Sequence, residues 1–123
     1  MKIRYPLLSI FFGLFLYFAI QPAFSAYLKN IHVTVNQPNG TELALFLTGD
    51  EYYQRLHDAN DFTIVRDKLG YYVYAILEND VLMPGTIVVG QGDPRTMGLK
   101  PGLNISPGKW KQLREDFWKD TPA

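Results

Sequence analysis

Hydrophobic and polar residues alternate along two neighbouring segments, residues 31–35 and residues 43–47. Alternation with period two is typical of strands that bury one face. Between the segments, "QPNGT" contains a proline, which fixes φ, and an Asn-Gly pair, which tolerates positive φ. The pattern therefore predicts a β-hairpin near the start of the folded region.

The next segment has the pattern of a short helix with a capping box. In such a box the first side chain accepts from the amide of the fourth residue, and the fourth side chain reaches back to the first amide. An apolar stripe over residues 52–56 and the imidazole of His57 near the end of the helix fit the same prediction. Asp58 then starts a turn. The capping box consists of Thr48, Gly49, Asp50 and Glu51.

Strand-like segments return after this predicted helix. Residues 62–77 read as a second hairpin with its turn at residues 67–70, and a further turn is expected at residues 79–80. Residues 86–89 are the last strand-like run. We therefore expect an α+β domain with an antiparallel sheet of about five strands and one inserted helix.

Glycine and proline dominate the sequence after residue 90. We expect residues 26–90 to form the α+β core and residues 91–105 to form an extended arm. Ser106 as the N-cap and Pro107 at the first helical position predict a terminal helix over residues 106–120. Its apolar stripe includes Trp110 and Phe117 and requires a partner surface.

Residues 1–25 have the features of a secretory signal peptide. Lys2 and Arg4 precede an apolar run, residues 6–20, which is shorter than the roughly twenty residues that cross a bilayer. Ala23 and Ser25 occupy the small-residue positions of a cleavage site. We expect cleavage near Ser25, an extracellular or periplasmic location, and no membrane attachment afterwards.

Composition and charge exclude several classes of function. The 123-residue chain has no cysteine, so thiolate zinc sites and cysteine nucleophiles are ruled out. It has 12 basic and 12 acidic residues, so no basic surface for nucleic acid is indicated.

His57 and its acidic neighbours are the most obvious candidate for a reaction centre. Zinc sites usually combine two or three imidazoles or thiolates at set spacings, such as H-E-x-x-H, and this spacing is absent. Capping and turn formation account for the carboxylates. We therefore predict no catalytic, cofactor-binding or metal-binding residues, and no enzyme activity.

Tyr72 and Tyr74 fall on the same face of a predicted strand. An exposed pair would form an aromatic platform for a sugar, whereas a buried pair would pack across the sheet. The first arrangement would suit a secreted module that binds glycan or a cell-surface partner. Self-association through an open sheet edge and the Trp110/Phe117 stripe is a third possibility.

Four blocks of this sequence resemble the N-terminal pro-region of secreted bacterial zinc metallopeptidases of the immune inhibitor A type. They are "VTVNQPNG", "GDEYYQRLHD", "GYYVYA" and "GLKPGLNISP", and they span most of the chain after residue 32. The resemblance implies a domain that assists folding of a peptidase, keeps it latent and is removed by proteolysis. In that family a catalytic domain with an H-E-x-x-H helix follows the pro-region.

The sequence ends at Ala123, before the position where the resemblance places the peptidase domain. We therefore expect a pro-domain without its enzyme, whose partner is a secreted zinc metallopeptidase. If latency used a carboxylate from the arm in place of the zinc-bound water, Asp93 would supply it. Asp93-Pro94 is also an ordinary turn start.

Overall fold

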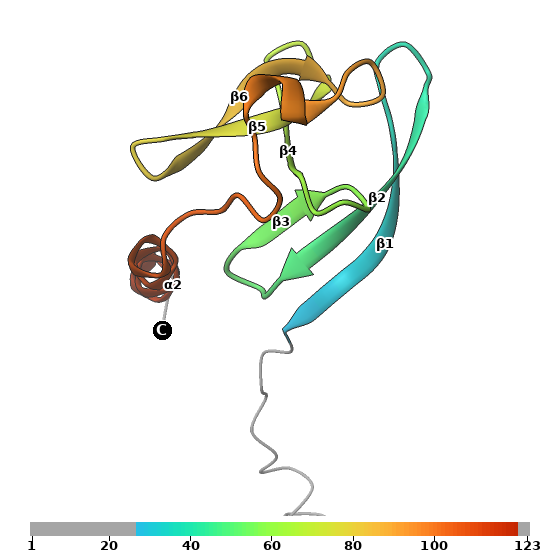
Figure 1. Ribbon diagram of the computed structural model, residues 1–123. Coiled ribbons are helices and arrows are strands. Elements are labelled where there is room, and N and C mark those ends of the chain that lie inside the picture. Colours follow the sequence, from blue (N-terminus) through green and yellow to red (C-terminus); the bar gives the residue numbers. More distant parts are fainter. Residues whose placement is uncertain (1–26, 121–123) are drawn as a thin grey trace, which may run out of the picture.

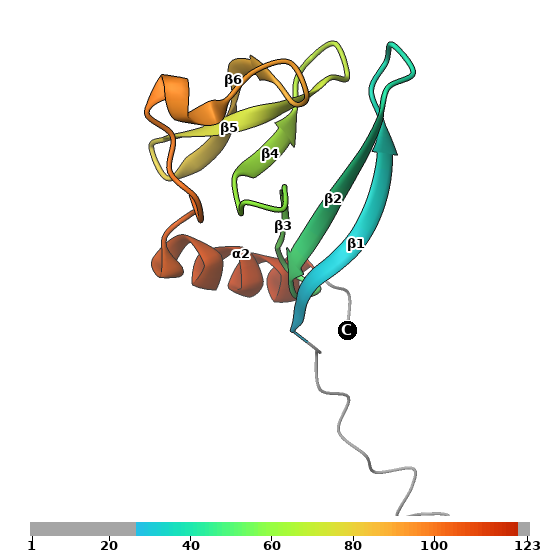
Figure 2. The ribbon, with the colours of Figure 1, turned by 45° about the vertical axis from the view of Figure 1, so that its right-hand side comes forward.

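Six antiparallel strands follow one another across the sheet in the same order as in the sequence. The computed structural model, which describes residues 27–120, shows a strongly twisted sheet with a helix below it (Figures 1 and 2). The predicted α+β class is confirmed, with six strands instead of five. The strands are β1 (Leu28–Asn36), β2 (Glu42–Gly49), β3 (Gln54–His57), β4 (Thr63–Arg66), β5 (Tyr72–Glu78) and β6 (Val81–Val88).

The predicted inserted helix is wrong, because its residues form a turn and strand β3. Strand β2 continues through Thr48 and Gly49, and β3 returns antiparallel to it. Asp50 caps the turn between them: its Oδ1 accepts from the amides of Tyr52 at 2.9 Å and Tyr53 at 3.1 Å. The acidic residue of the expected capping box therefore closes a hairpin.

Tertiary pairing explains why this segment is not helical. Leu56 lies opposite Leu47 of β2 on one side and Ile64 of β4 on the other, so β3 forms a ladder with both neighbours. A helix would satisfy the same backbone groups locally but would leave β2 and β4 without this strand between them. Glu51 lies exposed in the turn.

The three predicted turns are present. Residues 37–41 join β1 to β2, and residues 67–70 join β4 to β5. Asn79 and Asp80 join β5 to β6 with φ values of 51° and 59°. Both central residues have positive φ, as in the tight turns that match strand twist, and Asn and Asp tolerate this conformation.

The hydrophobic core lies on one face of the twisted sheet and draws on several strands. Val33 and Val35 of β1 and Leu99 of the arm pack against its edge. Residues on alternate positions of the strands supply it, as the period-two pattern requires. Its buried members are Leu43, Leu45, Phe62, Ile64, Tyr74 and Val89.

Gln37 connects the first hairpin to the far side of the sheet. Its side chain is only 3% exposed. Nε2 donates to the carbonyls of Tyr72 at 3.0 Å and Val89 at 3.2 Å, and Oε1 accepts from the amide of Tyr72 at 2.8 Å. These bonds join the β1–β2 turn to β5 and to the end of β6.

The arm packs against the domain and includes a short 3-10 helix, η1 (Pro94–Met97). The amide of Gly102 donates to the carbonyl of Asp61 at 2.8 Å, and the hydroxyl of Thr63 donates to the carbonyl of Leu103. Besides η1, residues 91–92, 98 and 101–102 lie in turns or bends, so the predicted extended conformation is present only in short stretches. The arm is fixed to the start of β4.

The terminal helix α2 (Pro107–Asp120) begins as predicted, with Ser106 as its N-cap. The Ser106 hydroxyl accepts from the amide of Lys109 at 3.1 Å and donates to Asp80, and the amide of Ser106 donates to Asp80 at 2.7 Å. Asp80 thus attaches the start of α2 to the β5–β6 turn. The helix runs beneath the sheet toward the β2–β3 end (Figure 2).

The predicted signal peptide, residues 1–25, lies outside the described residues. Among residues 27–120, no helix is long and apolar enough to cross a membrane.

Candidate functional site

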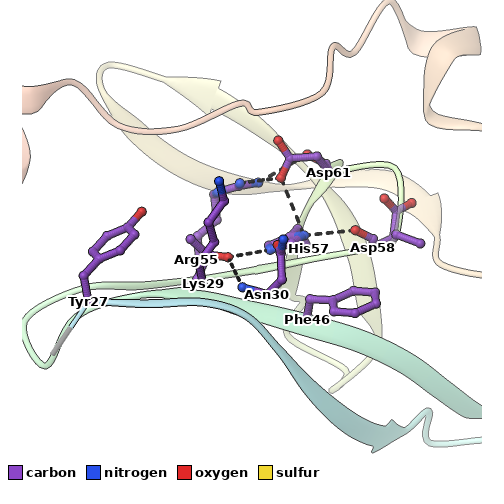
Figure 3. Close-up of a pocket in the computed structure, with 10 residues that line it drawn as sticks. Tyr27, Lys29, Asn30, Phe46, Arg55, His57, Asp58 and Asp61 are labelled. Carbon is purple, nitrogen blue, oxygen red and sulfur yellow. Dashed lines mark hydrogen bonds and ion pairs between the residues drawn. The ribbon is translucent and has the colours of Figure 1, made fainter.

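A polar pocket of about 390 Å³ lies where β1, β2, β3 and the turn after β3 meet. Figure 3 shows charged and aromatic side chains converging on it from these four segments. The edge strand contributes through a bulge at Asn30, whose φ is 52°. Its walls include Tyr27, Lys29, Asn30, Phe46, Arg55 and His57.

His57, at the end of β3, is the central buried residue of the pocket and is 3% exposed. Its Nδ1 lies 2.9 Å from the carbonyl of Asp58, which can only accept, so this nitrogen carries the proton. Nε2 of the ring lies 2.8 Å from the hydroxyl oxygen of Thr48, within hydrogen-bonding distance. The same hydroxyl oxygen accepts from the amide of Asn30 at 3.0 Å. The hydroxyl and imidazole therefore connect β1, β2 and β3.

The ring of Phe46 stacks against the ring of His57. Their rings are nearly parallel, with centroids 5.8 Å apart and an interplanar angle of 18°. Phe46 also contacts His32 of the edge strand, at 4.6 Å between centroids. Phe46 thus stacks on His57 and meets His32 at a tilt, on the face of the sheet opposite the core, and this packing limits rotation of the His57 ring.

Arg55 and Asp61 form the charged wall of the pocket. Arg55 Nη2 lies 2.5 Å from Asp61 Oδ1, and Nη1 donates to the carbonyl of Asp61 at 3.2 Å and to the hydroxyl of Thr63 at 3.1 Å. Asp61 has a φ of 69° and is half exposed. Its Oδ1 is also 3.5 Å from Nδ1 of His57. The guanidinium thus holds the turn after β3 in a left-handed conformation that few residue types adopt.

Asp58 is engaged by the turn and by the core. Its Oδ1 accepts from the amides of Asn60 at 2.9 Å and Phe62 at 3.0 Å, and Oδ2 accepts from the hydroxyl of Tyr74 at 3.0 Å. Burial, with the nearby charge of Asp58 as a smaller cause, raises the pKa of Tyr74 to about 12. The carboxylate of Asp58 therefore stabilises the fold.

The order hydroxyl, imidazole, carboxylate at Thr48, His57 and Asp61 resembles a nucleophile triad in outline. In this pocket, however, the hydroxyl is held by the amide of Asn30 and the imidazole is nearly inaccessible. The carboxylate is committed to Arg55. The cluster is best understood as a polar clamp on three strands. Within residues 27–120, no group of three or more His, Cys, Asp or Glu is placed to hold a metal ion.

Of the two arrangements open to Tyr72 and Tyr74, the structure shows packing within the domain and no exposed platform. Tyr74 is 6% exposed and belongs to the core, where its ring meets Phe62 edge-on at 6.2 Å. Tyr72 is half-buried and lies under the guanidinium of Arg66 at 5.3 Å. The face that these two tyrosines share is the core face of the sheet, so Tyr74 cannot contact a partner in this fold.

Asp93 lies exposed in the arm, but its carboxylate has local partners. It is the N-cap of η1: Oδ1 accepts from the amide of Arg95 at 2.9 Å, and Oδ2 lies 3.6 Å from the Arg95 guanidinium. One carboxylate oxygen is therefore used by the local turn. The other faces only an exposed ion pair, which is weak in water.

Helix α2 presents aromatic residues to solvent. Phe117 is 46% exposed and Trp118 is 60% exposed, and Tyr52 of the β2–β3 turn contacts both rings, at 5.1 and 6.1 Å between centroids. We call Tyr52, Phe117 and Trp118 the aromatic surface. Trp110 lies nearer the start of α2, 6.5 Å from Tyr27.

The sequence identified Phe117 and Trp110 but missed Trp118 and Tyr52. Tyr52 was assigned to a helix of its own, and only the hairpin turn brings it to the end of α2. Trp118 lies outside the apolar stripe of α2, so the spacing of hydrophobic residues along the helix does not mark it as a contact residue. Arg55 was missed for the same reason as Tyr52, because the pocket exists only with β3 in the sheet.

Comparisons with known proteins identify no relative. No protein-family model, no curated protein and no solved structure matches the chain. The resemblance to metallopeptidase pro-regions therefore stays a prediction from the residues.

Proposed function

We propose that this chain is a non-catalytic, secreted, pro-domain-like protein that binds a zinc metallopeptidase of the immune inhibitor A type. Binding would keep the peptidase latent or assist its folding. The observation that carries the proposal is the aromatic surface: α2 buries none of its residues, and Phe117 and Trp118 stay exposed at its end. Exposed aromatic clusters are enriched at protein interfaces.

The positions of the resembling blocks support the same proposal. "VTVNQPNG" covers the end of β1 and most of the first hairpin turn, and "GYYVYA" covers the first four residues of β5. Gln37 of the first of these blocks binds the backbone of Tyr72 in the other. "GLKPGLNISP" is the arm that Thr63 and Asp80 hold before α2. The blocks are therefore parts of one hydrogen-bonded unit that ends at the exposed helix.

Asp93 is the candidate inhibitory ligand within this proposal. A carboxylate can replace the zinc-bound water of a peptidase, and Oδ2 of Asp93 would become available by breaking one exposed ion pair with Arg95. Asp93→Asn keeps an acceptor for the Arg95 amide but removes the charge. If this variant inhibits as well as the unaltered protein, Asp93 does not ligate the zinc.

The first test is inhibition of a purified peptidase of this type by the protein expressed from residues 1–123, with a dose response and pre-incubation. Tight inhibition that fades as the added protein is cleaved is the expected result. Trp118→Ala should weaken it at least about tenfold, because truncation of an interface aromatic commonly costs more than 1.4 kcal/mol. Gln112→Ala, an exposed change on the same helix, is the matched control.

Absence of binding by the demonstrably folded protein would contradict the proposal. The alternative is then a stand-alone secreted module that recognises glycan or a cell-surface partner. In this alternative the aromatic surface is a better candidate for the sugar-binding site than the tyrosines of β5, because stacking on a sugar requires exposed rings. A glycan array with the unaltered protein and Trp118→Ala would distinguish the two functions.

A further inference from the structure

The two edges of the sheet differ in how they are protected from pairing with another chain. Edge strand β6 contains Pro84, and its Thr86 hydroxyl contacts the sulfur of Met97 in η1 at 3.9 Å. Edge strand β1 has nine residues, no proline and a single charged residue, Lys29, near one end. No described element lies beyond β1 in either view (Figures 1 and 2). Beyond Lys29 and the bulge at Asn30, residues 31–36 contain no Asp, Glu, Lys or Arg, and a regular edge of this kind is a template for pairing.

Hydrogen-bond directions show which backbone groups of β1 are free. The amide of Gln37 donates across the hairpin to the carbonyl of Thr41 at 2.8 Å. Because these directions alternate along an antiparallel strand, the amides of residues 31, 33 and 35 also face β2. The amides and carbonyls of His32, Thr34 and Asn36 therefore face away from the sheet.

We propose that β1 pairs antiparallel with β1 of a second copy of this chain, about a two-fold axis at Thr34. In this register Thr34 faces Thr34 of the second copy, and His32 faces Asn36. All three outward-facing residues then form hydrogen-bonded pairs at once. The result is a continuous sheet across both copies, with an isologous interface.

The side chains of β1 suit this register. Val33 faces Val35 of the second copy, and the Thr34 pair meets on the other side of the sheet; β-branched and Thr–Thr pairs both stabilise neighbouring strands. Ile31, on the core side of β1, is 43% exposed in one copy and gains cover from the second. Lys29 lies outside the paired segment, so no like charges meet. This neutral self-complementarity favours a second copy over an unrelated strand.

Replacement of Thr34 separates backbone pairing from side-chain contact. Thr34→Pro removes the backbone N–H that faces the second copy but leaves the hydrogen bonds between β1 and β2 in place. Proline is tolerated at this position because β1 is an edge strand. Thr34→Ala keeps the amide and removes the side-chain pair. Analytical ultracentrifugation of the purified protein, expressed from residues 1–123, should show a concentration-dependent dimer. Thr34→Pro should weaken it at least about tenfold through two lost hydrogen bonds, and Thr34→Ala should change it far less.

Amide hydrogen exchange provides a second readout that does not depend on a variant. On raising the concentration of the unaltered protein, the amides of His32, Thr34 and Asn36 should become protected. Those of Ile31 and Val33 should be protected at every concentration. A protein that stays monomeric, exchange that is independent of concentration, or a dimer that Thr34→Pro leaves intact would each overturn the proposal. The last outcome would point to the aromatic surface instead.

Discussion

Gln37 should be one of the most sensitive positions in the domain, although it lies next to an exposed turn. We consider Gln37→Met, which keeps the length of the side chain and removes its polar atoms. The change deletes three hydrogen bonds: two part-buried ones with the backbone of Tyr72 and a buried one to the carbonyl of Val89. The carbonyl of Tyr72 keeps a partner in the amide of Val89 at 3.0 Å. The amide of Tyr72 and the carbonyl of Val89 lose the partner that Gln37 provides.

A net contribution of about 1 kcal/mol for each hydrogen bond gives an expected loss of about 3 kcal/mol in the free energy of unfolding. This is a large share of the roughly 5 to 15 kcal/mol that stabilises a typical domain. Equilibrium unfolding in urea, followed by circular dichroism, measures the loss directly. An unchanged slope with a lower midpoint would show that stability alone has changed.

Asn39→Ala is the matched control in the same turn. Asn39 Oδ1 accepts from the amide of Thr41 at 3.0 Å, but this bond is exposed, so water can replace it. We expect a loss below about 1 kcal/mol. Equal losses for Gln37→Met and Asn39→Ala would refute the reasoning, because burial would then make no difference to the value of these bonds.

Three further predictions concern pH and backbone geometry. Because burial raises the pKa of Tyr74 to about 12, above its ordinary value of 10.0, the folded state holds this proton more tightly than the unfolded state. Stability should therefore fall as pH rises from about 10 to about 12, and a urea titration of Tyr74→Phe should lack this component of the fall. Hydrogen bonds from the N-cap residue of α2 hold the pKa of Asp80 below its usual value, so the attachment of α2 should weaken as pH falls through that lowered pKa. Tryptophan fluorescence should report this change, and in Asp80→Asn the acid-dependent step should be missing. Gly49→Ala should prevent the β2–β3 hairpin from closing, since φ is 146° and a Cβ would lie 2.2 Å from the carbonyl oxygen of Tyr53. Near-native circular dichroism and stability of this variant would contradict that expectation.

Local patterns were sufficient to predict the hairpins and the start of α2. The turns at residues 37–41, 67–70 and 79–80 each contain residues whose own conformational preferences select a tight reversal. Ser106 and Pro107 likewise specify a helix start through groups within four residues of one another. In these elements the decisive interactions are close in the sequence.

For the candidate site, the sequence indicates some of the residues but not how they are arranged in space. The sequence indicates that His57 and its acidic neighbours are the polar centre of the segment. The partners of His57 and Asp58, Thr48 and Tyr74, lie 9 and 16 residues away in the sequence, so local patterns do not reveal them. Arg55 joins them only because β3 is a strand, which places its side chain beside the turn at Asp61. A helical interpretation of the same residues gives no pocket.

The sequence by itself determined the alternation of buried and exposed positions, the turns and the amphipathic terminal helix, because each depends on neighbouring residues and on the fixed geometry of the backbone. Only the tertiary structure decided that residues 54–57 form a strand, since pairing with β2 and β4 outweighed a local capping pattern. It also decided that Tyr74 is core, that Gln37 holds two distant segments together, and that β1 has a free edge. Each of these outcomes depends on which segments distant in the sequence become neighbours, and hydrogen bonding and burial between them set the result.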